Sequence, residues 1–357
     1  MSEELIFAGP GGYARLTARS HKDRQGAVLH IANPNSKVDI LPPQALAEVN
    51  CALDALEGDR RLKFAVLCGA EVPVHAGADI NMFAGGLAPE ESPPDYAALR
   101  AYLEQGTALD LRIKQVSRSV TTVAAIQGER FGGAVEWPLM CSYVVAAPET
   151  GIQFSEVNIG FLPGWDGILN AMLKSGPLNA LFMGTLGARL DAGQMDRAGI
   201  VNLVAAETGK LLGAALDLAA QAPPGTERGE GKPLAEPEAL LATLAERLDV
   251  RRYEALAAEA AAKQKQLDAK ELSRHIDKRL AELGRPVAPL AVEAIFGLVA
   301  AGAGLEPSDA DGVAALARAE AERCFALMHT RDRVTGVNSV LKARENPLNK
   351  IPLFRRG

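Results

Sequence analysis

The chain has 357 residues and a formal net charge of −6, with 48% hydrophobic and 23% charged residues. This composition is typical of a globular protein with one large domain and an additional part. The negative net charge gives little support to a nucleic-acid partner. No apolar run approaches the roughly 20 residues that a membrane span requires, so we expect no membrane partner either.

The N-terminal segment lacks the basic and apolar regions of a signal peptide. The four cysteines are far apart and show no metal-ligand spacing, so we expect reduced thiols and a cytoplasmic location. The five histidines are also scattered. We find no G-x-S-x-G elbow and no phosphate-binding P-loop, which leaves serine nucleophiles and nucleotide hydrolysis without support.

From about Leu16 to Val204, short β-rich runs alternate with helical patterns. The clearest strands are "AVLHIANP", "FAVLCG", "VTTVAAIQG" and "CSYVVAAP". Helical patterns lie between them in "PPQALAEVNCALDALEG" and "DYAALRAYLEQGTALDLRIKQVSR". This alternation predicts an α/β fold with mainly parallel strands and helical crossovers.

Beyond about Ala205 the strand patterns stop. A helical pattern, "GKLLGAALDLAAQA", is followed by a charged break rich in proline and glycine. The next long stretch is rich in Ala, Leu, Glu, Lys and Arg, which predicts helix as far as Gly284. We therefore divide the chain into a core over 1–205 and a C-terminal helical region over 206–357, with an added helical insertion at about 223–285.

The stretch "VHAGADINMFAGG", Val74 to Gly86, follows a predicted strand and is rich in small residues. Small residues at such a turn indicate that another group must come close to the backbone.

A second stretch, "VAAIQGERFGGAVEWPLM", contains a strand that ends at "IQG" and a helix that begins near Gly132 and Gly133. Adjacent glycines at a helix start leave backbone N–H groups accessible, and the helix dipole favours an anion or a developing oxyanion there. Glu136 lies in the first turn of this helix. Its alternative role is to complement the positive end of the helix dipole.

A third stretch, "IQFSEVNIGFLPGWDG", places Glu156 after a short β-like piece and Pro163-Gly164 at a turn. Taken alone, a glutamate in this position is more often an ordinary charge on a solvated loop than a catalytic group.

Together, "AGADI", "IQGERFGGAVE" and "FSEVNIGFLPGWDG" are similar, in this order and spacing, to motifs of the enoyl-CoA hydratase/isomerase, or crotonase, superfamily. The resemblance covers about Leu16 to Val204 and returns in "HTRDRVTGVNSVLKARENP" near the C-terminus. It implies a crotonase-like ββα spiral core followed by a C-terminal helical region.

The resemblance also implies an acyl-CoA site with an oxyanion hole formed by the backbone N–H groups of Ala76 and Gly133. A Cβ branch at either place is expected to hold the thioester away. The implied substrate-binding residues are Ala76, Gly77, Ala78, Asp79, Ile80, Gly132, Pro163, Gly164 and Trp165.

Glu136 and Glu156 match the two catalytic carboxylates of the family's hydratases. The resemblance therefore implies an enoyl-CoA hydratase that needs no metal or other cofactor, with coenzyme A as part of the substrate. Double-bond isomerisation and hydrolysis of a ring or C–C bond stay open as alternatives. So does a non-catalytic scaffold that binds acyl-CoA.

Some residues depart from the family pattern. Trp165 stands where small residues are usual and is expected to narrow the acyl pocket. We favour Asp166 as the N-cap of the next helix, with a third acid in the pocket as the alternative. For His75 we expect a packing or surface role, and for Asp79 a structural hydrogen bond in the turn.

The resemblance further implies a homo-oligomer, a trimer or a hexamer. The Ala-rich segment from about Tyr253 to Leu283 supports this expectation, because an amphipathic helix must bury its apolar stripe on its own core or on a neighbouring subunit.

Overall fold

The structure is a computed structural model in which the strands form two sheets. It describes residues 4–85, 94–225, 231–247, 288–330, 332–334, 336–337 and 340–341. The larger sheet has seven strands in the order β1-β2-β3-β5-β7-β9-β12. Their bounds are Leu5–Ala8 (β1), Ala14–His21 (β2), Arg24–Ile31 (β3), Phe64–Gly69 (β5), Thr121–Ile126 (β7), Tyr143–Ala146 (β9) and Leu203–Val204 (β12).

The smaller sheet has five strands in the order β11-β10-β8-β6-β4. Their bounds are Asp39–Ile40 (β4), Val74–Gly77 (β6), Glu129–Phe131 (β8), Gly151–Gln153 (β10) and Leu190–Asp191 (β11). Pairing is parallel from β3 to β12 and from β4 to β10, and antiparallel at β1-β2-β3 and β10-β11. The predicted α/β fold with mainly parallel strands is confirmed.

Helices connect and cover the two sheets. The α-helices in the described part of the chain are Pro43–Gly58 (α1), Tyr96–Val116 (α2), Gly133–Met140 (α3), Gly167–Ser175 (α4), Pro177–Leu186 (α5), Ala192–Arg197 (α6), Leu211–Gln221 (α7), Pro237–Arg247 (α8), Pro289–Gly302 (α11) and Ala310–Leu327 (α12). Short 3-10 helices lie at Ile80–Phe83 (η1), Glu156–Ile159 (η2) and Thr208–Lys210 (η3).

The chain repeats one unit in which a strand of the larger sheet precedes a strand of the smaller sheet and then a helix. The units are β3-β4-α1, β5-β6-α2, β7-β8-α3 and β9-β10-α4. Each unit adds one strand to both sheets, which is the ββα spiral expected from the motifs.

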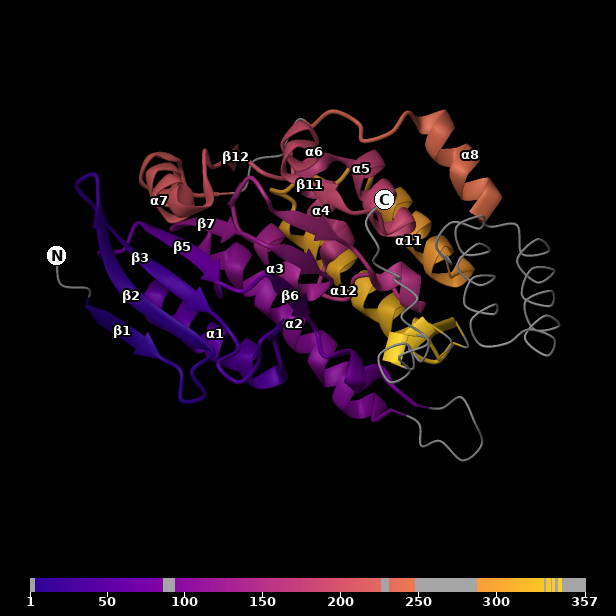
Figure 1. Cartoon of the computed structure of the whole chain (residues 1–357), viewed down its shortest axis with the longest axis horizontal. Coiled ribbons are helices and arrows are strands. Elements are labelled where there is room, and N and C mark those ends of the chain that lie inside the picture. Colours follow the sequence, from indigo (N-terminus) through magenta and orange to yellow (C-terminus); the bar gives the residue numbers. More distant parts are fainter. Residues whose placement is uncertain are drawn as a thin grey trace, which may run out of the picture.

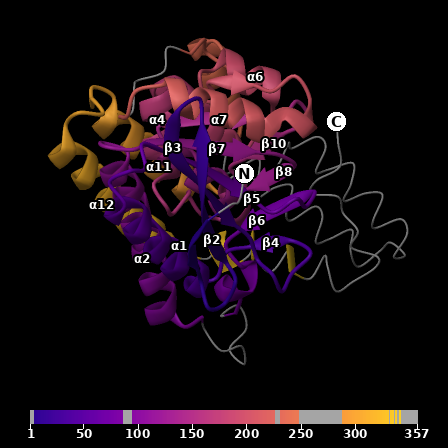
Figure 2. The same cartoon turned by 90° about the vertical axis from the view of Figure 1, so that its left-hand side faces the viewer.

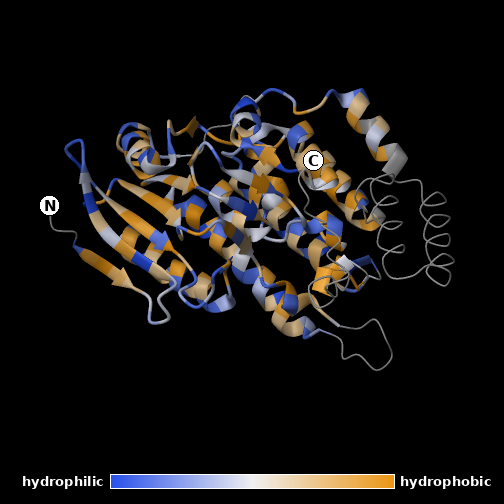
Figure 3. Cartoon of the chain, viewed as in Figure 1, coloured by the Kyte–Doolittle hydropathy of each residue, from blue (hydrophilic) through white to orange (hydrophobic). Residues whose placement is uncertain are grey.

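Both faces of the larger sheet are buried at its central strands β5, β7 and β9, and alternate residues of these strands face opposite ways. Leu67 and Ala124 belong to the main core, which α1 covers. Their neighbours Val66 and Val123 belong to a second cluster under α7. Figures 1 and 2 show the sheet between these two helices, and Figure 3 shows the hydrophobic residues gathered on its strands.

The C-terminal helices pack onto the α/β part. Helix α11 lies on α4 and α5, and α12 lies on α2 and α4 (Figure 1). Ile295 and Leu316 from these helices belong to the same apolar core as Ile168 of α4. The last strand, β12, ends beside the predicted boundary at residue 205. The division into two domains stays a prediction.

Most of the predicted insertion at 223–285 and much of the closing motif lie outside the described residues. None of the helices in the described part of the chain combines the length and apolar character needed to cross a membrane.

Gly160 shows how closely the C-terminal segment packs on the core. Its φ is +86°, and a Cβ placed on it would lie 2.3 Å from the backbone N of Arg333. We expect Gly160→Ala to lower the free energy of unfolding by about 3 kcal/mol, through left-handed strain and the backbone clash. Denaturant titration measures this difference. Gly213→Ala in α7, where nothing lies within 4 Å of the new Cβ, is the control and should stabilise slightly. Equal stability of the two variants would contradict the packing.

Candidate active site

The three predicted motifs meet at the ends of three neighbouring parallel strands. Strands β6, β8 and β10 lie side by side in the smaller sheet. Ala76 and Gly77 end β6, Gly132 follows β8, and Glu156 begins the 3-10 helix after β10. Ligands of parallel sheets bind at the carboxyl ends of strands, so this convergence defines the candidate site.

The turn after β6 lies directly on the first residues of α3. Gly77 has φ +71°, and a Cβ on it would lie 2.4 Å from the N of Ala134 and 2.7 Å from the Cα of Gly133. This contact brings the strand end at Ala76 next to the start of α3. As the first residue of that helix, Gly133 has an N–H without an acceptor inside the helix.

The expectation that a Cβ at Gly133 holds a thioester away stays a prediction. A Cβ there would lie 2.4 Å from Cζ3 of Trp165, so the glycine makes room for an indole ring. Gly106 of α2 makes room for the same ring, and Tyr102 packs edge-on against it, with ring centroids 5.1 Å apart. Trp165 is therefore a packing residue between α2 and α3, only 2% exposed.

Glu156 lies against the turn that precedes α3. A Cβ on Gly132 would lie 2.9 Å from Oε1 of Glu156 and 3.8 Å from the carbonyl oxygen of Ala76. The other carboxyl oxygen of Glu156, Oε2, is buried and has no hydrogen-bond partner among the described residues. Burial raises the pKa of Glu156 to about 7.

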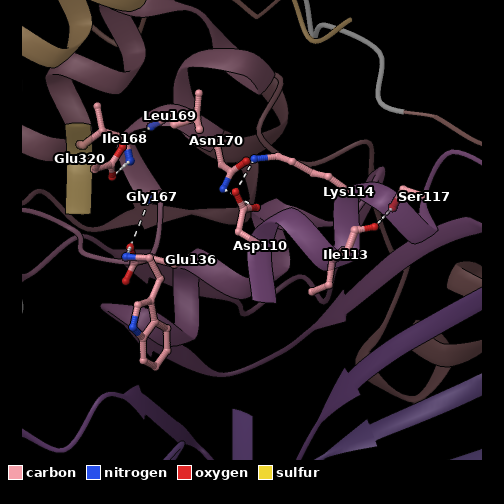
Figure 4. A network of polar contacts seen from close by, with 11 residues as sticks. Asp110, Ile113, Lys114, Ser117, Glu136, Gly167, Ile168, Leu169, Asn170 and Glu320 are labelled. Carbon is pink, nitrogen blue, oxygen red and sulfur yellow. Dashed lines mark hydrogen bonds and ion pairs between the residues drawn. The ribbon is translucent and has the colours of Figure 1, made fainter. Parts of the chain in front are cut away.

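Glu136 is buried in the first turn of α3, and its Oε1 accepts two backbone hydrogen bonds (Figure 4). The donors are the N–H groups of Trp165 at 2.8 Å and Gly167 at 3.2 Å. Burial and then the charge of Glu156 raise the pKa of Glu136 well above its ordinary value, whereas the two N–H groups oppose this shift. The two carboxyl groups thus belong to one electrostatic unit.

The remaining predicted residues lie along two turns. Asp79 caps η1 by accepting from the N–H of Asn81 at 2.9 Å, so the expected structural hydrogen bond is present. Ala78 and Ile80 pack beside the main core. In the second turn, Pro163 is buried and Gly164 faces α2 and α12, because a Cβ on it would lie 2.6 Å from Leu103 and 2.9 Å from the Sγ of Cys324.

Asp166 occupies the N-cap position of α4, but its side chain makes no capping hydrogen bond. The expected N-cap position is therefore confirmed, but the Asp166 side chain does not act as the cap. Its backbone is left-handed, with φ 63° and ψ 29°, and neither carboxyl oxygen has a partner in the described structure. Burial, followed by the charges of Asp110 and Glu320, raises the pKa of Asp166 well above its ordinary value.

Asp110 of α2 is the centre of the polar contacts around this turn. Its Oδ2 accepts from Lys114 at 2.5 Å, and its Oδ1 accepts from Asn170 at 3.1 Å (Figure 4). The alternative role of Asp166, a third acid in the pocket, stays a prediction.

His75 is fully buried, and its Nδ1 lies 2.9 Å from Oδ2 of Asp39 on the neighbouring strand β4. Burial and the nearby charge of Arg130 lower the pKa of His75, although Asp39 acts in the opposite direction. Of the two expected roles, packing is the one that the structure shows.

Two residues of the site region were not predicted from the sequence. Glu320 of α12 caps α4 by accepting from the N–H groups of Ile168 and Leu169. Arg333, also buried, donates to the carbonyl oxygens of Phe83 at 3.0 Å and Gly85 at 2.7 Å, which ties the C-terminal segment to the turn after η1. For Glu320 a signal exists in the sequence, because it lies on the apolar stripe of its helix.

The fold and the two-carboxyl site define a crotonase-type protein. A model of the family described as enoyl-CoA hydratase/isomerase matches residues 23–276. The chain belongs to this family, which confirms the resemblance drawn from the motifs.

The sequence identity of the chain to individual relatives is low. The chain is 31% identical over 179 residues to the peroxisomal bifunctional enzyme of Homo sapiens, an alignment of 50% of this chain and 22% of that protein. The chain thus spans about a fifth of the length of this relative. Similar solved structures include DspI of Pseudomonas aeruginosa, with 28% identity, TM-score 0.50, and coverage of 58% of this chain and 76% of that one. An enoyl-CoA hydratase from Rhodobacter sphaeroides 2.4.1 has 20% identity, TM-score 0.61, and coverage of 92% and 90%, and shares the fold.

The raised pKa of Glu156 predicts a pH-dependent stability. In the folded protein its pKa is about 7, against an ordinary value of 4.5. Between these values the native state holds more protons than the unfolded chain. The stabilisation from this group is therefore complete below the ordinary value and is lost as the pH rises through about 7. Relative to the wild type, Glu156→Gln should thus gain stability between pH 5 and pH 8, by on the order of 2 kcal/mol.

Thermal unfolding of both proteins at the two pH values measures this effect. Glu104→Gln, with a side chain that is 64% exposed, is the control and should differ from the wild type by the same amount at both pH values. A pH-independent difference for Glu156→Gln would contradict the prediction.

Proposed function

We propose that this protein is an enoyl-CoA hydratase, which adds water across the C2=C3 double bond of an α,β-unsaturated acyl-CoA thioester. The observation that carries the proposal is the pair Glu136 and Glu156, in which burial raises both pKa values and the charge of Glu156 acts on Glu136. Glu136 lies in the first turn of α3, the helix that Gly133 begins, and Glu156 lies against Gly132, near the end of β6 at Ala76. Membership of the enoyl-CoA hydratase/isomerase family supports an acyl-CoA substrate.

In this proposal the backbone N–H groups of Ala76 and Gly133 bind the thioester oxygen. Charge moves onto this oxygen as water attacks C3, so two aimed donors stabilise the enolate more than the substrate. One donor of this kind contributes about 3–4 kcal/mol to transition-state stabilisation in other enzymes.

Glu136 and Glu156 carry one proton between them, because two carboxylates in one buried site resist ionising together. The ionised member takes a proton from water as the water oxygen forms its bond to C3. The π electrons move to the thioester oxygen, and the protonated member then delivers its proton to C2 of the enolate. One water molecule is added, and the pair again holds one proton. The proposed steps use no metal ion or redox cofactor.

If the pair acts as one unit, Glu136→Gln and Glu156→Gln should each lower turnover at least about 100-fold. The double variant should lose little more than either single variant, since each removes the same function. Affinity for the CoA ester should change little.

Loss of the enoyl-thioester absorbance of crotonyl-CoA measures hydration. Glu104→Gln, at an exposed position of α2, is the matched control and should keep full turnover. Near-wild-type hydration by either single variant would refute the paired mechanism. The wild type could also act on a cyclic enoyl-CoA or a β-keto acyl-CoA and not on crotonyl-CoA. That result would refute hydration of linear substrates and indicate another reaction of the family.

We also propose that the protein is a homo-oligomer, a trimer or a hexamer, as its resemblance to the family implies. Light scattering at micromolar concentration tests this proposal. A mass near 37.6 kDa, that of one chain, would refute it.

A further inference from the structure

Glu320 of α12 is a fully buried carboxyl group with both oxygens in hydrogen bonds to the start of α4. Its Oε1 accepts from the N–H of Ile168 at 2.8 Å, and its Oε2 accepts from the N–H of Leu169 at 2.9 Å (Figure 4). The two donors are separated from Glu320 by about 150 residues in sequence. The C-terminal helical region thus supplies the cap that Asp166 does not provide.

The same turn also holds Glu136. Along five consecutive residues, the N–H groups of Trp165 and Gly167 point to Glu136, and those of Ile168 and Leu169 point to Glu320. The turn is therefore held between a carboxyl group of α3 and a carboxyl group of α12, and Figure 4 shows Glu136 and Glu320 on either side of it.

The backbone of this turn is not relaxed. Asp166, between the two donors to Glu136, has φ 63°. A left-handed residue lets the N–H groups on either side of it converge on one acceptor, at a cost of about 1–2 kcal/mol for a residue other than glycine. A strained turn keeps its shape only while its surroundings determine that shape. Glu320 supplies two of the hydrogen bonds that do so.

We propose that Glu320 is a positioning residue for Glu136, acting through the turn 165–169. This inference rests on the proposed function, since it assigns Glu136 to the chemistry. Without the Glu320 carboxyl group, the first turn of α4 has buried N–H groups without acceptors. The turn then relaxes toward other donors and acceptors, and the N–H groups of Trp165 and Gly167 no longer hold Oε1 of Glu136 in place.

Two variants and one control test the inference in the full-length chain. Glu320→Gln is nearly isosteric and keeps one acceptor oxygen, whereas Glu320→Ala keeps none. Because small displacements of a catalytic group are costly, we expect kcat to fall about tenfold in Glu320→Gln and about 100-fold in Glu320→Ala, with KM changed less than about twofold. Glu322→Gln, on the same helix with a side chain that is 64% exposed, should keep wild-type kcat.

A second measurement does not depend on activity. At a pH where Glu136 is protonated, its carboxyl C=O stretch is found from the infrared difference between the wild type and Glu136→Gln. Hydrogen bonds to the carbonyl oxygen lower this frequency. We expect the band to move to higher frequency in Glu320→Gln, because the two N–H donors are displaced, and to stay in place in Glu322→Gln.

These measurements distinguish failure of the inference about Glu320 from failure of the proposed function. An unmoved band together with unchanged kcat in Glu320→Gln overturns the inference, even if the melting temperature falls, because Glu320 then only caps a helix. A shifted band with a lower kcat supports it. If the wild type hydrates no enoyl-CoA, the proposed function fails, and the band alone still decides whether Glu320 positions Glu136. If Glu320→Ala does not fold, the comparison of Glu320→Gln with Glu322→Gln decides whether Glu320 positions Glu136.

Discussion

The two backbone hydrogen bonds to Oε1 of Glu136 are the interaction on which the rest of the site depends. A carboxyl group buried on the first turn of a helix is costly unless its oxygens find donors, and the donors here come from Trp165 and Gly167 on a separate turn. The position of α4 is thereby coupled to that of α3. The left-handed backbone of Asp166 and the cap from Glu320 are consequences of the same requirement, since both keep the turn in the one shape that serves Glu136.

Close approach of backbone to backbone is the second constraint. Gly77 brings the end of β6 onto the start of α3, so the two segments with the proposed oxyanion donors cannot move independently. The indole of Trp165 occupies the space left by the missing side chains of Gly106 and Gly133, and it locks the turn before α4 between α2 and α3. The glycines of the motifs thus have a packing role inside the protein, whatever they also do for a substrate.

Much of the fold could be predicted from the sequence, because the strands β3, β5, β7 and β9 are apolar runs between clear helical patterns. The strands of the smaller sheet are two to four residues long, too short to show a period. Glu136 and Glu156 could be identified because each lies within a local motif. The cap from Glu320 could not, since it depends on how α12 docks on α4, and Asp166 looked like the cap because local patterns favour an acid there.

The charges and hydrogen-bond donors around Glu136 and Glu156 limit the kind of reaction that the site can support. The groups that most strongly shift the pKa of Glu136 are Glu156, Glu320 and the backbone N–H groups of Trp165 and Gly167, and none of these groups is a cation. Backbone N–H groups are therefore the main compensation for negative charge, and they are weaker in this respect than a lysine or an arginine. In the proposed mechanism, a pair in this environment keeps one proton near neutral pH, which leaves one base and one acid within the same site. Chemistry that takes a proton from water and gives one to carbon needs both at once, whereas a fully ionised pair beside a cation would supply only the base.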